Sequence, residues 1–146
     1  MALTIVDKAR LLHGAPLFSE VPTEILADLA ALTTVQQSTE RTTLFRQGEP
    51  ADSFYFVIAG TVRALCNEEE VYRAGPGEEV GALAVLDHQP RAFSAVADES
   101  CNLLRVGAED FLDLLEQHPA LARGVIRHLA QELRRAAGGD SSHRAR

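Results

Sequence analysis

The spacing of apolar residues follows a helical period at both ends of the chain and a strand period in the middle. Apolar positions recur every three or four residues up to about residue 32 and again after Gly107. Pro22, Thr23 and Glu24 suit the start of a helix, and Gly138-Gly139 suits the end of one. The predicted helices cover residues 3–12, 21–32, 109–117 and 120 to about 137.

Between residues 34 and 107 polar and apolar residues alternate in short runs, which Gly and acidic clusters separate. The candidate strands are Thr34–Gln37, Thr43–Arg46, Phe54–Ile58, Thr61–Leu65, Glu70–Arg73, Glu79–Gly81, Ala92–Ala97 and Asn102–Val106. Their number and spacing favour an antiparallel sandwich or barrel, and no βαβ alternation supports a doubly wound sheet. The pattern predicts one α+β domain, mainly β, in four segments. These are N-terminal helices (1–33), a β-structure (34–107), two C-terminal helices (108–137) and a flexible tail (138–146).

The composition agrees with a single globular domain of 146 residues, 46% of them hydrophobic and 24% charged. No apolar run approaches the roughly 20 residues that cross a bilayer. The N-terminus lacks the layout of a signal peptide. We therefore expect a cytoplasmic protein without membrane insertion. Cys66 and Cys101 are far apart and are expected to be reduced thiols, not part of a zinc site.

Charge is distributed unevenly along a chain whose net charge is −7. Residues 1–120 hold 8 basic and 19 acidic side chains, whereas residues 121–146 hold six arginines against Glu132 and Asp140. The net acidity argues against general nucleic-acid binding. Two interpretations of the basic end stay open. It contacts RNA, DNA or an acidic partner, or it is a solvated helix end whose cations complement the helix dipole.

The last predicted helix carries two apolar stripes. The first is spaced 4, 3 and 4 residues apart, as in the seam of a paired helix, and consists of Ala122, Ile126, Leu129 and Leu133. The second, Leu121 and Val125, is placed to face the barrel. This pattern predicts a homodimer through the first stripe. The alternative is a helix that buries only one face in its own core.

Enzyme motifs are absent from the sequence. It has no His-Glu-x-x-His, no Gly-x-Ser-x-Gly and no phosphate-binding Gly-x-x-x-x-Gly-Lys-Ser/Thr segment. The histidines show no metal-ligand spacing, and the acidic run at residues 68–70 lies in a predicted turn. We expect no catalytic residues, no metal and no cofactor.

One segment, residues 77–94, suggests an anion site. A strand ends at Gly81, a short apolar helical turn follows, and a loop then brings Pro90-Arg91 to the next strand. Backbone N–H groups near Leu83 and Ala84, with the Arg91 guanidinium opposite them, would favour a phosphate. The other interpretation makes Arg91 an ordinary ion-pair partner.

The order of these blocks resembles the cyclic nucleotide-binding domain family, the β-roll of the catabolite activator protein and of protein kinase A regulatory subunits. The resemblance covers about residues 10–137. It rests on residues 44–62, on Gly81–Leu86 with Pro90-Arg91, and on the helices of residues 109–137. It implies an antiparallel β-roll of the double-stranded β-helix or jelly-roll kind, with C-terminal helices as lid and dimer axis. The implied ligand is cyclic AMP or cyclic GMP, and the implied ligand-binding residues are Gly81, Ala82, Leu83, Ala84, Pro90, Arg91, Ala92 and Phe93.

Two residues depart from the family pattern. Ala82 stands where the family has a glutamate that accepts a hydrogen bond from the ribose 2′-hydroxyl, and Phe93 stands where the family has a small residue. By strand parity Phe93 is expected to point the same way as Arg91, where it stacks on a base or fills the nucleotide's space; the second is favoured.

Two functions remain. The chain is a non-enzymatic regulatory module that senses a cyclic nucleotide or another phosphate-bearing ligand for an unknown effector protein. Alternatively, the cassette is degenerate, binds no small molecule and serves dimerisation or protein interaction. Direct DNA binding is not expected, because the helix-turn-helix of related regulators would need roughly 60 further residues.

Overall fold

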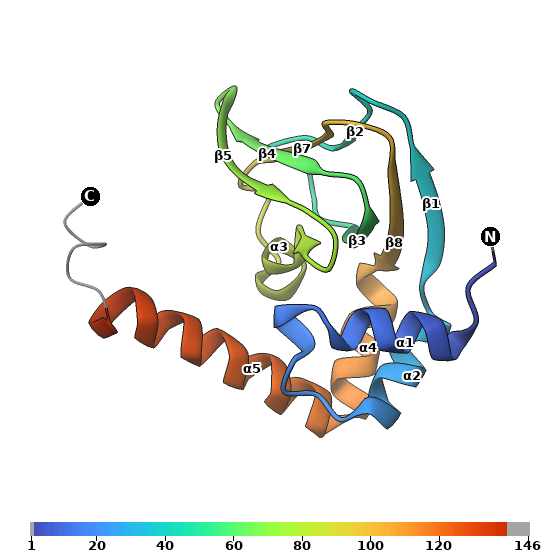
Figure 1. Cartoon of the computed structure of the whole chain (residues 1–146). Coiled ribbons are helices and arrows are strands. Elements are labelled where there is room, and N and C mark those ends of the chain that lie inside the picture. Colours follow the sequence, from blue (N-terminus) through green and yellow to red (C-terminus); the bar gives the residue numbers. More distant parts are fainter. Residues whose placement is uncertain (1, 140–146) are drawn as a thin grey trace.

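Two four-stranded antiparallel sheets form a β-roll above a layer of helices in the computed structural model, which describes residues 2–139 (Figure 1). The sheet orders are β1-β8-β3-β6 and β2-β7-β4-β5. The strands are β1 (Thr34–Ser38), β2 (Thr43–Phe45), β3 (Ser53–Ala59), β4 (Val62–Cys66), β5 (Glu69–Ala74), β6 (Glu79–Val80), β7 (Ser94–Ala97) and β8 (Cys101–Gly107). The helices are α1 (Ile5–His13), η1 (Pro16–Phe18), α2 (Thr23–Ala31), α3 (Ala82–Asp87), α4 (Ala108–Gln117), α5 (Pro119–Arg134) and the π-helical η2 (Arg135–Gly139).

The predicted fold class is confirmed, and all eight predicted strands lie within two residues of the observed ones. The largest difference precedes β7, which begins at Ser94 and not at Ala92. Arg91 bonds to the turn after β2 instead: its N–H donates to the Glu49 carbonyl and its carbonyl accepts from the Gly48 N–H, both at 2.8 Å. The argument from strand parity therefore did not apply to Arg91 and Phe93.

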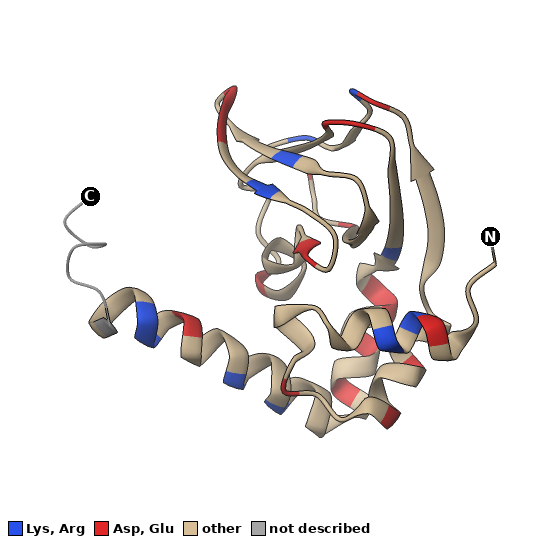
Figure 2. Ribbon diagram, viewed as in Figure 1, with Lys and Arg blue, Asp and Glu red and all other residues tan. Residues whose placement is uncertain are grey.

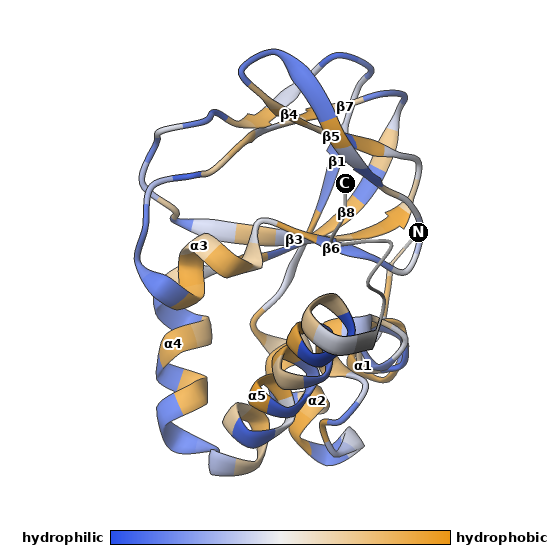
Figure 3. Ribbon diagram, turned by 90° about the vertical axis from the view of Figure 1, so that its left-hand side faces the viewer, coloured by the Kyte–Doolittle hydropathy of each residue, from blue (hydrophilic) through white to orange (hydrophobic). Residues whose placement is uncertain are grey.

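Two apolar clusters stabilise the fold. One fills the roll between the sheets and includes Val57, Val62 and Leu103. The other lies between the helices and the sheet that contains β3 and β8. At its centre, the rings of Phe54 and Phe111 meet edge to face with centroids 4.9 Å apart. Figure 3 shows hydrophobic residues on α3 and on the helices below the roll.

Helix α5 leaves the body of the protein part-way along its length (Figure 1). Its buried residues, Leu121, Gly124 and Val125, lie in the first half. Leu121 and Val125 are buried as predicted, but α5 packs mainly on η1 and α4 and not on the roll. A Cβ on Gly124 would lie 2.6 Å from Val21 Cγ2, so the glycine permits this close approach.

The α-helical part of this segment ends at Arg134, three residues before the predicted end, and continues as η2 through Gly139. Residues 140–146, the rest of the predicted tail, lie outside the described residues. Figure 2 shows arginines spaced along α5. Within residues 2–139, no helix combines the length and apolarity needed to cross a bilayer.

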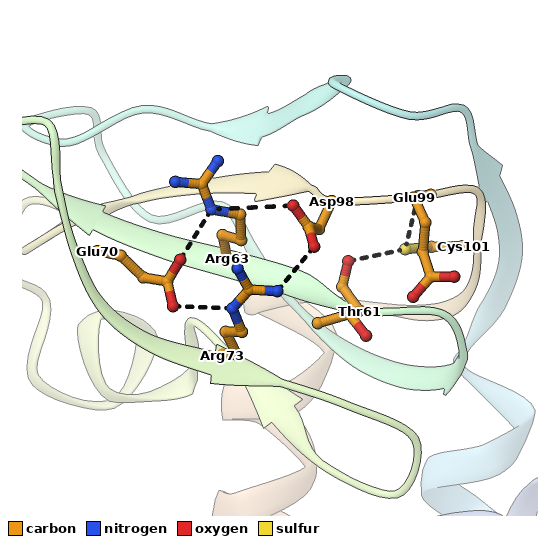
Figure 4. Close-up of polar contacts among 7 residues, drawn as sticks. All are labelled: Thr61, Arg63, Glu70, Arg73, Asp98, Glu99 and Cys101. Atoms are coloured by element: carbon orange, nitrogen blue, oxygen red, sulfur yellow. Dashed lines mark hydrogen bonds and ion pairs between the residues drawn. The ribbon is translucent and has the colours of Figure 1, made fainter.

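Four charged side chains form a network on the outer face of the second sheet (Figure 4). Arg63 and Arg73 face each other across β4 and β5, and Glu70 lies between them, 2.9 Å and 2.8 Å from their Nε atoms. Asp98 is 2.8 Å from Arg73 Nη1. The two acids neutralise a like-charge pair that would otherwise weaken the strand pairing.

Cys66 and Cys101 are free thiols, as expected. Cys101 is buried, and its Sγ lies 3.3 Å from the Thr61 carbonyl and 3.2 Å from the Glu99 carbonyl (Figure 4). Burial raises the pKa of the Cys101 thiol, so it remains protonated and unreactive at neutral pH.

Gly60, in the turn between β3 and β4, provides a test of the fold. It has a φ of +92°, and a Cβ there would lie 2.5 Å from the Ser100 carbonyl. Gly48 has a similar φ, +88°, with nothing within 4 Å of its Cβ position. We expect Gly48→Ala to cost about 1–2 kcal/mol of unfolding free energy from backbone strain alone. Gly60→Ala should cost about 1–3 kcal/mol more because of the clash. Urea unfolding measures both, and equal midpoints for the two variants would contradict the packing described.

Candidate functional site

A pocket of about 260 Å³ opens between α3, the loop before β7 and the edges of β2, β5 and β6. This volume is just below the roughly 300–1,000 Å³ of small-molecule sites. The lining residues come from four separate stretches of the sequence. They are Phe45, Tyr72, Glu79, Gly81, Ala82, Leu83, Ala84, Arg91, Ala92 and Phe93.

Arg91 is the buried cation of this pocket, with 3% of its surface exposed. Its Nη1 donates to the Gly81 carbonyl at 2.9 Å and its Nη2 to the Ser53 carbonyl at 2.5 Å. The Phe45 ring covers one face of the guanidinium, with Cζ 3.8 Å from the ring centroid. Two backbone carbonyls and one aromatic face therefore hold the group in a single orientation.

The charge of Arg91 is only weakly compensated. The nearest carboxylate, Asp52, lies 3.7 Å from Nη2, is largely exposed, and lies equally far from Arg105. The buried Nε–H of Arg91 has no acceptor among residues 2–139. Burial lowers the pKa of Arg91 and Asp52 partly opposes this effect, but a guanidinium remains protonated. A buried cation with an unused donor favours an anionic ligand.

Gly81 allows the Arg91 guanidinium and the Phe45 ring to pack closely against the backbone. Its φ is +92°, and a Cβ at this position would lie 2.8 Å from Arg91 Nη1 and 2.9 Å from Phe45 Cε2. Any other residue would push the guanidinium or the ring aside. The same glycine precedes α3, so it also fixes the direction in which that helix begins.

Aromatic side chains form the apolar wall. The Phe93 ring lies 5.8 Å from the Phe45 ring and 5.3 Å from the Tyr72 ring, the second pair edge to face. Phe93 and Arg91 do line one pocket, although not as members of a strand. Phe93 narrows this pocket and leaves it open.

Glu79 gives the same pocket a carboxylate. The nearby backbone amide of Ala82 lowers the pKa of this carboxylate, in opposition to burial. Burial, and secondly the negative charge of Glu78, raise the pKa of Glu79 above its usual 4.5. The pKa of Tyr72 is also raised, chiefly by burial and then by Glu79 and Glu78. The pocket therefore contains one cation and one acid.

The structure brings together most of the residues that the sequence suggested. Seven of the eight line the pocket, whereas Pro90 lies against a neighbouring hollow with Gly48 and Pro50. Sequence reasoning missed Phe45 and Tyr72, which reach the pocket from other strands. It noticed Glu79 only as a neighbour of the position where the family has its glutamate.

The site is connected to the C-terminal helices through two consecutive residues. The Ser53 carbonyl accepts from Arg91, and the preceding carbonyl, that of Asp52, accepts from the Ala108 N–H at 2.9 Å. Ala108 is the first residue of α4. One hydrogen bond on each side of the Asp52–Ser53 peptide therefore connects the Arg91 guanidinium to the start of α4.

Metal binding receives no support from the described part of the chain. Within residues 2–139, no group of three His, Cys, Asp or Glu side chains is arranged to hold a metal ion.

The raised pKa of Glu79 predicts a pH-dependent stability. The folded state binds this proton more tightly than the unfolded chain does. The resulting stabilisation is full below the unfolded pKa near 4.5 and is lost as the pH rises through the folded pKa. Glu79→Gln should therefore be more stable than the wild type at pH 7, with the difference shrinking toward pH 4. Thermal unfolding at both pH values measures this, with the exposed Glu69→Gln as control. Equal melting temperatures at pH 7 would refute it.

The chain is similar to known proteins over most of its length. It is 30% identical over 141 residues to an uncharacterized NTE family protein of Mycobacterium tuberculosis, covering 96% of this chain and 24% of that protein. It is 36% identical over 98 residues to the cyclic AMP receptor protein of Thermus thermophilus, covering 64% of this chain and 45% of that protein. The chain thus spans less than half the length of either relative.

A solved structure, the N-terminal domain of a transcriptional regulator from Streptomyces coelicolor, has 30% identity and a TM-score of 0.77, covering 87% of this chain and 94% of that one. The family model for the cyclic nucleotide-binding domain matches residues 35–118, more than half of the chain, including β2 through α4 and the whole pocket. The chain belongs to the cyclic nucleotide-binding domain family.

Proposed function

We propose that this chain is a non-enzymatic regulatory module that binds a phosphate-bearing ligand, with cyclic AMP and cyclic GMP as the first candidates. The observation that carries the proposal is Arg91, a guanidinium 3% exposed whose Nε–H lacks an acceptor among the described residues. The phosphate would take the place of that missing acceptor. The resemblance to a protein named for cyclic AMP supports the choice of ligand.

The ligand would act on the helices through the β2–β3 loop. A phosphate on Arg91 competes with the Ser53 carbonyl and Asp52 for the guanidinium, and the Asp52 carbonyl holds the first N–H of α4. Such coupling requires that the ligand prefers one of two arrangements of α4 and α5. The effector that reads this arrangement would be another protein or another part of a longer chain, and the setting we propose is the cytoplasm.

A second function is favoured by two of the pocket residues. Ala82 offers no side-chain acceptor to a ribose hydroxyl, and Phe93 narrows the space beside Arg91. In this alternative the two carbonyl bonds of Arg91 are purely structural and the module serves dimerisation or protein interaction. Because these bonds stabilise the fold in either case, the melting temperature of Arg91→Ala does not separate the alternatives, and ligand binding must be measured directly.

We also propose that the module forms a homodimer through the α5 stripe of Ala122, Ile126, Leu129 and Leu133. Support comes from the exposure of this stripe: Ile126 is 64% and Leu133 is 70% exposed. Leu129 packs partly against the helical core. The exposed large apolar side chains of the stripe are therefore those of Ile126 and Leu133. Pairing with a second copy would bury them.

Calorimetric titration with cyclic AMP and cyclic GMP tests ligand binding. Wild type should bind at least one of them, and Arg91→Ala should weaken binding by about tenfold or more, because a charge-assisted contact is lost. Arg105→Ala is a matched control, since Arg105 lies as far from Asp52 as Arg91 does but outside the pocket. Absence of heat with wild type at millimolar ligand would overturn the proposal and favour the alternative.

Sedimentation tests the dimer. Wild type should sediment as a dimer and Ile126→Glu as a monomer, because the charge would be buried in the apolar seam. Gln131→Glu, on an exposed position of the same helix, should remain dimeric. A monomeric wild type would exclude the seam, as would a dimeric Ile126→Glu.

A further inference from the structure

The solvent side of α5 carries three arginines in one row. Arg123, Arg127 and Arg134 are all exposed and are spaced four and seven residues apart. Because each residue turns an α-helix by about 100°, the three positions lie within about 40° of one another, along about 16 Å of helix. Ala130, also exposed, lies between them and adds only a methyl group. Figure 2 shows basic residues spaced along this projecting helix. We call the three arginines the arginine row.

The described part of the chain does not neutralise the arginine row. The one acid of α5, Glu132, pairs with His128 and Arg135, and neither belongs to the row. No ion pair within residues 2–139 involves an arginine of the row. The first two of these arginines lie one helical turn apart, and like charges at this spacing destabilise a helix. The arginine row therefore does not serve the stability of α5.

The helix dipole accounts for only one of the three arginines. A cation stabilises a helix C-terminus within the last turn, and Arg134 lies in the last turn of α5. Arg127 lies about two turns earlier, and Arg123 lies in the first half of the helix, where the dipole gives a cation no advantage. The interpretation of the basic end as a solvated helix terminus thus leaves two arginines unexplained. A partner that supplies negative charge would explain all three.

The charge of the remaining chain favours a protein partner over a nucleic acid. Residues 1–120 hold 8 basic and 19 acidic side chains, and three of these acids, Asp28, Asp110 and Asp113, line one hollow between α2 and α4. Helix α4 packs against α5. A nucleic acid carries charge along its whole length, so beyond the arginine row it would meet this acidic surface and be repelled. A protein helix can confine its carboxylates to the length of the row, where each can bind a guanidinium through two hydrogen bonds.

We propose that the arginine row is a docking surface for an acidic helix of a partner protein, whose carboxylates pair with Arg123, Arg127 and Arg134. Ile126 and Leu133 project about 80–100° away from the row, so the proposed homodimer leaves this surface accessible. The inference rests on the proposed function only for the partner's role as effector, and the contact itself needs no nucleotide.

The test is a calorimetric titration with two synthetic helical peptides. The matched peptide carries three glutamates spaced seven and four residues apart on an alanine and glutamine background, and the scrambled peptide has the same composition with its glutamates on different faces. Wild type should bind the matched peptide about fivefold or more tightly than the scrambled one. The double variant Arg127→Gln/Arg134→Gln should weaken binding of the matched peptide by about fivefold or more, because two ion pairs are lost.

Arg10→Gln/Arg46→Gln is the matched control, because it removes the same charge from two exposed arginines outside α5. It should bind the matched peptide as wild type does. Raising the salt from 0.1 M to 1 M shortens the screening length from about 10 Å to about 3 Å and should weaken binding to wild type. Sedimentation should give the same oligomeric state for wild type and for the variant of the arginine row. A change in that state would attribute the loss of binding to the dimer seam and contradict the proposal.

The other outcomes are equally decisive. Absence of heat with wild type and the matched peptide at millimolar concentration would overturn the proposal. Equal binding of the two peptides, or equal weakening by the two double variants, would show attraction by charge in general and no docking surface. Tighter binding of a DNA duplex than of the matched peptide would identify the partner as a nucleic acid instead. Since these titrations contain no nucleotide, each of these results leaves the proposed function to its own test.

Discussion

The structure of the pocket depends on how one guanidinium is held. The buried guanidinium of Arg91 donates hydrogen bonds to two backbone carbonyls and packs against one face of the Phe45 ring. No carboxylate of the described residues lies at hydrogen-bond distance from it. Burying a cation in this way is costly unless its donors are used, and its Nε–H has no acceptor within residues 2–139. Gly81 tolerates the close approach that this arrangement needs. The fold thus maintains a desolvated positive charge at the wall of an open pocket, which supports the proposed anionic ligand.

The same contacts connect the pocket to the helices. The Ser53 carbonyl and the Asp52 carbonyl are consecutive along the chain, and one holds Arg91 while the other holds the first N–H of α4. Beyond α4, the second half of α5 projects from the body with an exposed apolar stripe (Figure 1). The pocket is thus connected through the β2–β3 loop to α4, and α4 leads directly into α5. A module that binds a ligand and changes the presentation of α5 would need these three parts.

The sequence predicted the strands well because its two periods are strong, and all eight strands lie within two residues of their predicted limits. The periods alone favoured a sandwich or barrel, and the β-roll was implied by the family resemblance. The sequence was less informative where tertiary contacts determine a strand boundary or bring a residue into the pocket. Arg91 bonds to the turn at Gly48 and Glu49, and so β7 starts later than alternation suggests. Phe45 and Tyr72 reach the pocket through strand pairing, which no local pattern reveals. Glu79 looked like one of two adjacent acids, and only the structure shows that it lines the same pocket as Arg91.

The most direct measurement follows the Nε–H resonance of Arg91 by nitrogen-15 nuclear magnetic resonance during a titration with cyclic AMP, with the signal assigned by its absence from Arg91→Lys. If the guanidinium binds the phosphate, this resonance shifts with saturation and becomes coupled to phosphorus. A resonance that stays unchanged at millimolar ligand would show that the buried charge serves the fold alone.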